Sequence, residues 1–298
     1  MAASTDAIRG INCTATTATS NLGLYYNTIY LNATSSGVNF GTSGIYHTNS
    51  TTSTSAQLDM RDNIVVNNST PVGTGLTVAF RRSAANATLN NYSTLSNNND
   101  FYAGTPGPSN LIFNDGTNSD QSVADFKTRV TPRESSSFSE NPTFINSTTA
   151  PYDLRINTTT PTQIESGGVT VATPIAITSD YDGDLRNAST PDVGADEFAG
   201  VGLDLTAPSI AYTALQNTSS TGSRTLVATV TDASGVPTTA PGWPNLYWKT
   251  NTSGTYTAVT PTSVVGSDYS YSFGGGVVMG DTVFYYMVAQ DNATVPNV

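Results

Sequence analysis

The chain has 298 residues, of which 11% are charged and 37% hydrophobic, and 15 Tyr and 10 Phe supply enough apolar surface for a folded, β-rich protein. Its net charge is −11, with 11 basic residues against 22 acidic ones. No basic face can be assembled from so few cations, which excludes nucleic acid as an expected partner.

Residues 9–104 contain two interleaved series of similar segments. The first series is RGINCTATT, SGIYHTNSTT and TGLTVAFRRS, aligned on Gly10, Gly44 and Gly75. The second is NTIYLN, DNIVVN and NNDFYAG, aligned on Ile29, Ile64 and Phe101. Short strands that recur in this way, without helices between them, predict a parallel β-helix whose turns stack on one another. We expect Asn32 and Asn67 to occupy equivalent corners and to hydrogen-bond between turns.

The repeats loosen beyond residue 105. A short helical turn is predicted in SDQSVADFKTRV (119–130), and irregular strands are predicted in NPTFIN (141–146), YDLRIN (152–157) and VATPIAIT (171–178). The Gly- and Ala-rich stretch AGVGLDLTAPS (199–209) then leads into a proline. Such a stretch predicts a domain boundary, so residues 1–200 are expected to form the C-terminal turns and the cap of the β-helix.

Residues 204–298 have a different pattern. Six segments alternate with period two, as half-buried antiparallel strands do: PSIAYTAL (208–215), RTLVATVTDASG (224–235), NLYWKTN (245–251), TYTAVTPTSVV (255–265), DYSYSFGG (268–275) and DTVFYYMVAQDNA (281–293). Six or seven short strands at this spacing predict an immunoglobulin-like β-sandwich. The fold class is therefore expected to be all-β, a solenoid followed by a sandwich.

The run NTIYLN…GTSGIYHT…LDMRDNIVVNNS…LSNNNDFYAGTP…DYDGDLRN…PDVGADEF resembles the last turns of right-handed parallel β-helix regions. These regions occur in large secreted or cell-surface proteins of Bacteroidetes. The tail LTAPSI…LVATVTDASGV…VFYYMVAQDNA is similar to the immunoglobulin-like modules that follow them. The resemblance implies an adhesin-like protein exported by type IX secretion.

Residues 179–198, SDYDGDLRNASTPDVGADEF, hold six carboxylates. Asp180, Asp182 and Asp184 match the first three ligand positions of a calcium loop, but neither the glycine nor the glutamate that an EF-hand requires follows at its proper position. We expect a capping loop here, in which Arg186 pairs with an aspartate. A structural calcium held by the three aspartates is the alternative, and no other cofactor is expected.

Several further residues are candidates for a site. Cys13 and His47, the only residues of their kinds, are expected to be structural. Asp204, Asp232 and Asp291 could meet and hold a calcium, although simple turn chemistry is the favoured reading. Tyr and Asn side chains on the β-helix surface could bind sugars. A polysaccharide lyase or glycoside hydrolase would draw on Asp59, Arg61, Asp62, Arg81, Arg82 and Asp100.

We therefore expect a non-catalytic segment of an extracellular or outer-surface adhesin-like protein of a bacterium, acting as a stiff scaffold or spacer. Its partners would be glycans or other surface or secretion proteins. The alternatives are a fragment of a β-helical lyase or hydrolase, and a secretion-cargo region with no binding role. No apolar run reaches the roughly 18 residues of a membrane span. We expect the start, MAASTDAIRG, to open an excised fragment.

Overall fold

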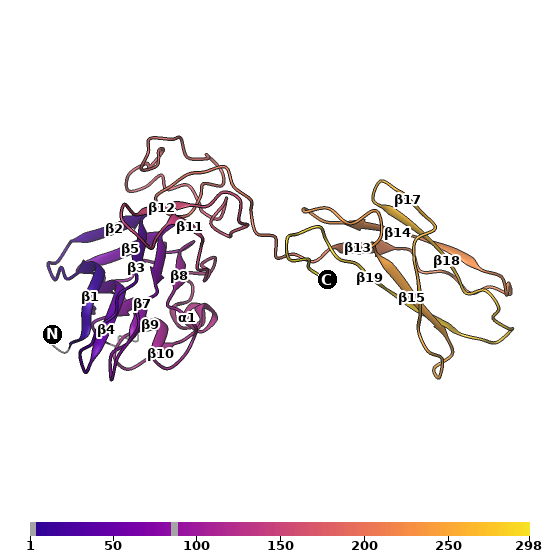
Figure 1. The fold of residues 1–298 in the computed structure, drawn as a ribbon, viewed down its shortest axis with the longest axis horizontal. Coiled ribbons are helices and arrows are strands. Elements are labelled where there is room, and N and C mark those ends of the chain that lie inside the picture. Colours follow the sequence, from indigo (N-terminus) through magenta and orange to yellow (C-terminus); the bar gives the residue numbers. More distant parts are fainter. Residues whose placement is uncertain (1–3, 85–88) are drawn as a thin grey trace. The chain divides into compact units, whose positions relative to one another are not determined.

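The computed structural model describes residues 4–84 and 89–298 (Figure 1). Contacts divide the chain into two compact units, residues 1–202 and residues 203–298, which are described separately. The first unit is a β-solenoid of about three turns with a long segment folded back on it. The second consists of two antiparallel sheets.

Each turn of the solenoid contributes strands to parallel sheets. The largest sheet stacks β1 (Ser4–Cys13), β4 (Phe40–His47), β7 (Thr77–Arg82) and β9 (Asn110–Asn114), with the short antiparallel β10 (Ser119–Asp120) beside β9. The others are β2 (Asn21–Tyr25) with β5 (Gln57–Arg61), and β3 (Thr28–Leu31) with β6 (Ile64–Asn67) and β8 (Asp100–Tyr102). The predicted parallel β-helix is thus confirmed.

The register corrects two of the predicted alignments. Ile29 lies opposite Val65, and Val65 lies opposite Phe101, so Ile64 is one residue out of alignment. In the other series Gly10 faces Gly44, where an added Cβ would lie 2.6 Å from the Gly44 carbonyl oxygen. On the next turn, Gly44 lies opposite Ala79 and not opposite Gly75. The glycine alignment failed because Gly75 precedes β7, which begins at Thr77.

Apolar side chains fill the interior of the solenoid. Ile45, Leu58, Met60, Val65, Phe80, Phe101 and Phe113 are fully or almost fully buried there. The helix α1 (Val123–Val130) contributes Phe126 and Val130 to the same core, and Ser122 caps it by accepting a hydrogen bond from the Asp125 amide. The predicted helical turn is thereby confirmed, and its role is to close one end of the stack.

Residues 141–202, called here the returning segment, pack against the outer face of the sheet β3-β6-β8. Two of the three predicted strands form, as the antiparallel pair β11 (Phe144–Asn146) and β12 (Asp153–Ile156). The strand predicted at 171–178 was wrong, because residues 172–176 are exposed and offer no face to bury. A second core forms under the segment from Ile64, Val66, Phe144, Ile156, Ile164 and Val193.

Residues 203–298 fold into two antiparallel sheets with one shared core. One sheet has the order β13-β14-β18-β17, formed by Ser209–Tyr212, Arg224–Thr231, Asp268–Phe273 and Ser263–Val265. The other has the order β16-β15-β19, formed by Thr257–Val259, Asn245–Thr250 and Val283–Val288. Every predicted segment holds a strand, and 255–265 holds two. The core comprises Leu226, Ala228, Val230, Leu246, Tyr269, Tyr271 and Phe273.

Candidate functional site

A ladder of asparagine side chains runs through one corner of the solenoid. Asn27, Asn63 and Asn99 occupy equivalent positions, 36 residues apart. Asn27 donates from its backbone and its side-chain amide to Asn63 Oδ1, and Asn63 donates in the same way to Asn99 Oδ1, at 2.8–3.0 Å. The ladder is therefore directional, because each turn donates to the next.

The expected corner residues, Asn32 and Asn67, do not form this ladder. Leu31 lies opposite Asn67, so the two asparagines are not in register. Asn67 is buried and bonds Thr42 and the Val78 carbonyl within its own neighbourhood. The left-handed backbone falls instead on the residue before each of the three ladder asparagines, at Tyr26, Asp62 and Asn98, and one turn later at Glu134.

Glu134 ends the ladder in the solenoid interior. Its buried carboxylate accepts hydrogen bonds from Asn99 Nδ2 at 2.8 Å, from the Tyr92 hydroxyl and from Ser137. Burial raises the pKa of Glu134, although the hydrogen bonds oppose that shift. A carboxylate in this position satisfies the last amide of the ladder, which would otherwise be left without an acceptor.

The returning segment is fastened to the same corner. The Tyr26 hydroxyl donates to the Val169 carbonyl, and the Val169 amide donates to Asp62 Oδ1 at 2.9 Å. One turn further on, Asn98 donates to the Gly167 carbonyl. Residues with left-handed backbone on three successive turns thus bind consecutive parts of one loop, which holds the segment along the axis of the stack.

The acidic stretch at 179–198 is used mainly to bind backbone amides. Asp180 accepts from the amides of Gly183, Asp184 and Glu197 at 2.8–2.9 Å. Asp192 accepts from the amides of Ser166 and Phe198 at 2.6–2.7 Å. Carboxylates placed in this way fix the path of a chain that has almost no regular secondary structure.

Arg186 connects this stretch to the solenoid. Its side chain is 4% exposed and pairs with Glu197 at 3.4 Å, instead of with the aspartate that the sequence suggested. It also donates to the carbonyls of Asp192 and Gly194. Its guanidinium lies 3.9 Å from the ring centre of Tyr26. A buried cation with these partners holds the two parts of the unit together.

Two of the buried acids make a testable contribution to stability. Burial raises the pKa of Asp62 and of Asp192 to about 7, against hydrogen bonds from Val169 and from Phe198 and Ser166 respectively. A carboxyl whose pKa is raised in the folded state favours folding while it is protonated. Its stabilising contribution is therefore complete below pH 4 and is lost as the pH rises through about 7.

We expect Asp62→Asn to raise the melting temperature relative to the unaltered chain, by an amount that grows between pH 5 and pH 8. The amide oxygen still accepts from Val169, but no charge has to be buried. Burial lowers the pKa of His47 to about 4, so its contribution to stability has the opposite pH dependence. His47 is present in both the variant and the unaltered chain, so its contribution cancels in the difference in melting temperature. A pH-independent difference in melting temperature would contradict a buried, titrating Asp62.

The calcium candidates of the acidic stretch stay a prediction. Asp180 uses both carboxylate oxygens for backbone amides, and Asp182 lies 3.8 Å from Arg155. Within the described residues, the side chains close enough to share an ion are those of Asp204, Asp232 and Asp291, whose ligand atoms lie within 4.8 Å of one another. The turn chemistry favoured for them is present too, because Asp232 and Asp291 bond amides of their own turns.

We expect millimolar calcium to raise the melting temperature of residues 203–298. The hydrogen bond from Ser234 lowers the pKa of Asp204, and those from Asn297 outweigh burial and lower the pKa of Asp291, so both are ionised at neutral pH. A divalent cation would relieve their mutual repulsion. Calorimetry with calcium and with EDTA tests this, and Asp291→Asn should abolish any difference. Identical melting in both solutions would leave turn chemistry as their whole role.

The other candidate residues are structural or already paired. Cys13 and His47 are buried, and His47 Nε2 lies 2.8 Å from the Ala56 carbonyl oxygen. Asp59 pairs with Arg61 at 2.8 Å. Arg81 lies 3.6 Å from Asp6, Arg82 is buried against Asn49 and Asn91, and Asp62 and Asp100 are fully buried. A polysaccharide on the surface could reach neither of these two aspartates.

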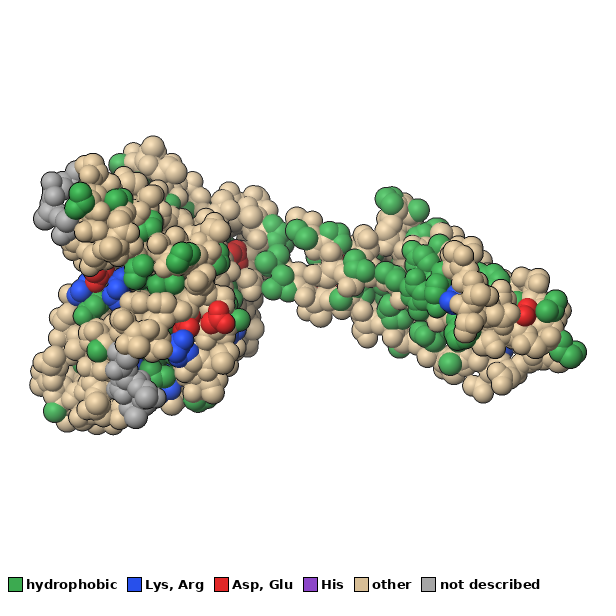
Figure 2. Space-filling view, turned by 90° about the horizontal axis from the view of Figure 1, so that it is seen from below, with side chains coloured by type: hydrophobic (Ala, Val, Ile, Leu, Met, Phe, Trp, Pro, Cys, Tyr) green, Lys and Arg blue, Asp and Glu red, His purple; other side chains and the backbone are tan. Residues whose placement is uncertain are grey.

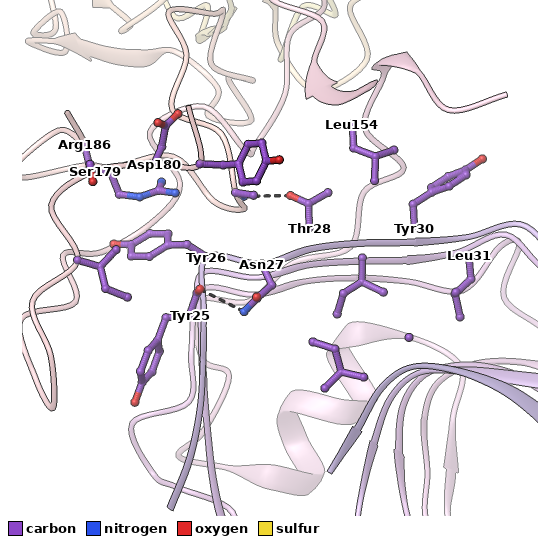
Figure 3. Close-up of a pocket in the computed structure, with 16 residues that line it drawn as sticks. Tyr25, Tyr26, Asn27, Thr28, Tyr30, Leu31, Leu154, Ser179, Asp180 and Arg186 are labelled. Atoms are coloured by element: carbon purple, nitrogen blue, oxygen red, sulfur yellow. Dashed lines mark hydrogen bonds between the residues drawn. The ribbon is translucent and has the colours of Figure 1, made fainter. Parts of the chain in front are cut away.

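A hollow of about 690 Å³ lies along β3 (Figure 3). The whole strand Thr28–Leu31 forms one side of it, together with Gly10 and Ile11. Leu154, Tyr181 and Ala195 of the returning segment line it as well. Most of its polar side chains are committed: Asn27 belongs to the ladder, and Thr28 Oγ1 accepts from the Ala195 amide. The hollow therefore offers few polar side chains without a partner, and its main feature is the unpaired edge of β3.

Aromatic side chains gather on the outer face of the sheet β16-β15-β19. Tyr247 and Tyr286 lie directly opposite one another, with ring centres 5.1 Å apart and planes at 9°. Tyr256 meets Tyr286 edge-on at 4.9 Å. Phe284 lies opposite Lys249, whose ammonium is 4.8 Å from the Tyr256 ring centre and 5.8 Å from that of Phe284.

We call Tyr247, Tyr256, Phe284 and Tyr286 the tyrosine platform. Tyr256, Phe284 and Tyr286 are each about two-fifths exposed. Figure 2 shows hydrophobic side chains gathered on the face of this unit that is seen from below. The alternation along β19 was predicted from the sequence. The register that joins these rings into one surface, with the inner-facing Leu246 and Met287 in the core, comes from the structure.

Comparison of the chain with protein-family models, with curated proteins and with solved structures gives no match. In the described part of the chain, no helix is both long and apolar enough to cross a membrane. The functional assignment therefore rests on the geometry described above and on the resemblance noted in the sequence.

Proposed function

We propose that this chain is a non-catalytic, adhesin-like scaffold whose second unit binds glycans on the tyrosine platform. The observation that carries the proposal is the platform itself, in which Tyr286 contacts both Tyr247 and Tyr256 and Lys249 lies between Tyr256 and Phe284, on an exposed sheet face. Aromatic faces pack against the apolar faces of sugar rings, and tyrosine adds a hydroxyl for hydrogen bonds. Lys249 adds a cation and a donor at the same surface.

The first unit suits a scaffold because several of its buried polar side chains are used to hold its turns and its returning segment together. The asparagine ladder and the carboxylates of the returning segment are spent on hydrogen bonds that hold the unit together, as the contacts of Asn63 and Asp192 illustrate. A closely bonded solenoid resists bending and proteolysis. This is what a spacer on a bacterial surface requires.

The finer parts of the proposal draw on the sequence. The two sheets and their shared core support an immunoglobulin-like sandwich for residues 204–298. The similarity to surface proteins of Bacteroidetes supports an extracellular or outer-surface location and export by type IX secretion. In that setting a glycan, or another surface or secretion protein, is the natural partner.

A glycan array with the intact chain, followed by titration of the best sugar, tests the binding role. The double variant Tyr247→Ala, Tyr286→Ala removes the stacked pair and should weaken binding by roughly ten- to a hundredfold, the equivalent of losing two aromatic contacts. Tyr181→Ala is the matched control, because Tyr181 is an exposed tyrosine of the first unit. It should bind as the unaltered chain does.

Three results would contradict glycan binding at the tyrosine platform. Unchanged binding by a folded double variant would place the sugar elsewhere, and loss of binding in Tyr181→Ala would place it at the hollow beside β3. Absence of binding to any sugar on the array would leave the chain as a spacer alone. Near-equal melting temperatures of the variants and the unaltered chain establish that they are folded.

A further inference from the structure

At one end of the solenoid, the first strand of each parallel sheet has an edge that pairs with no other strand among residues 4–84 and 89–298. β1, β2 and β3 are each the outermost strand of their sheet, and each pairs in parallel with a single neighbour. In Figure 1, β1 and β2 lie at one end of the stack and α1 at the other. The strands β1, β2 and β3 together are called here the open end. Unpaired edges of this kind are templates for another strand.

The apolar interior is also left incompletely covered at the open end. Ile11, Leu22 and Leu24 are only partly buried. Their counterparts on the next turn, Ile45, Leu58 and Met60, have no exposed surface. An apolar side chain at these positions is thus half-exposed on the first turn and fully buried on the second, which has a turn stacked on it. One solenoid turn is therefore the size of structure that would bury Ile11, Leu22 and Leu24.

The direction of the asparagine ladder indicates that an added turn must donate a hydrogen bond to Asn27. Asn63 Oδ1 and Asn99 Oδ1 each accept two hydrogen bonds from the turn before, whereas Asn27 Oδ1 accepts none from any described residue. Both hydrogens of the Asn27 side-chain amide are already used, by the Tyr25 carbonyl and Asn63 Oδ1. If a second copy of the chain faced this end, the side-chain amide of its own Asn27 would already have used both hydrogens. It could not donate a hydrogen bond to Asn27 Oδ1 of the first copy.

The hollow beside β3 provides the seat for such a strand. It follows the strand from Thr28 to Leu31, with Leu154 of the returning segment on the other side (Figure 3). Ala195 of the same segment also lines it. The returning segment therefore continues past the last strand of the sheet. A strand added parallel to β3 would pair with its edge and occupy the space between the two.

We propose that the open end is a docking surface for one further parallel β-solenoid turn that carries an asparagine at the ladder position. Its strands pair with β1, β2 and β3, its apolar side chains cover Ile11, Leu22 and Leu24, and its asparagine donates to Asn27 Oδ1. Proposed glycan binding lies in the other unit and is independent of this contact.

The test inserts a copy of residues 4–39 directly before Ser4 of the full chain. Amide hydrogen exchange of Thr28 and Tyr30 in the original turn should slow by about tenfold or more, because these two amides point to the free edge and become paired. The inserted turn should also resist protease. A matched insert with Leu22→Ser, Leu24→Ser and Ile29→Ser in the copy cannot pack and should leave exchange unchanged, and one with Asn27→Ala in the copy should give a smaller slowing.

Two results would overturn the proposal. The first is an inserted turn that is digested away while exchange of the Thr28 and Tyr30 amides stays at its original rate. The second is a dimer of the unaltered chain in sedimentation, with the same amides already protected, since it would make a second copy the occupant.

Discussion

Asn63→Ala is expected to lower the free energy of unfolding of residues 1–202 by roughly 3–5 kcal/mol, because several buried partners lose their hydrogen bonds together. The Asn63 side chain accepts both donors of Asn27 and donates to Asn99 Oδ1 and to the Leu24 and Arg61 carbonyls. An alanine side chain can form none of these hydrogen bonds. Chemical denaturation followed by amide hydrogen exchange within residues 1–202 measures the loss.

The matched control is Asn68→Ala. Asn63 directly precedes β6 and Asn68 directly follows it, but the half-exposed side chain of Asn68 donates a single hydrogen bond among the described residues, to Asn141. Removing it should cost less than about 0.5 kcal/mol. If the two variants were equally stable, the corner ladder would not be what holds the turns together.

Arg186→Ala is expected to detach much of the returning segment and to destabilise the first unit by roughly 3–5 kcal/mol, as removing one partner of a buried ion pair does. The substitution leaves Glu197 without its cation and exposes one face of Tyr26. It also leaves the Gly194 carbonyl without its donor. Limited proteolysis should then cut within residues 165–198 of the variant, and the same residues should resist cleavage in the unaltered chain.

Arg155→Ala serves as the control for charge. Arg155 pairs with Asp153 at 2.5 Å, but its side chain is 54% exposed. An exposed pair of this kind contributes about 1 kcal/mol at most. Equal protease sensitivity of the two variants, or an intact returning segment in Arg186→Ala, would show that Arg186 is not the connection between the segment and the solenoid.

The solenoid was predictable because its strands repeat with a near-constant period, and the strands of the second unit because their side chains alternate. The ladder was missed, although Asn27, Asn63 and Asn99 stand 36 residues apart in the printed sequence. Alignment on hydrophobic residues placed Ile64 beside Ile29 and shifted the comparison by one position. The sequence could have revealed the ladder, because an asparagine directly precedes each of the strands β3, β6 and β8.

The role of the acidic stretch was predictable only in outline. A capping loop was expected, but its partners are amides such as those of Ser166 and Phe198, whose positions depend on how residues 160–200 fold back. No local pattern encodes that path. The tyrosine platform was hidden for a similar reason, because the pairing of Tyr247 with Tyr286 joins strands that are far apart in the sequence.

Hydrogen exchange across the intact chain, read out residue by residue, tests most directly whether the first unit is a rigid, ladder-bonded scaffold. The slowest amides should be those of Asn63 and Asn99, with Val169 and Phe198 of the returning segment protected to a similar degree. Fast exchange at these amides, no slower than at the exposed loop around Thr148, would contradict a solenoid held together by its asparagine ladder and its acidic returning segment.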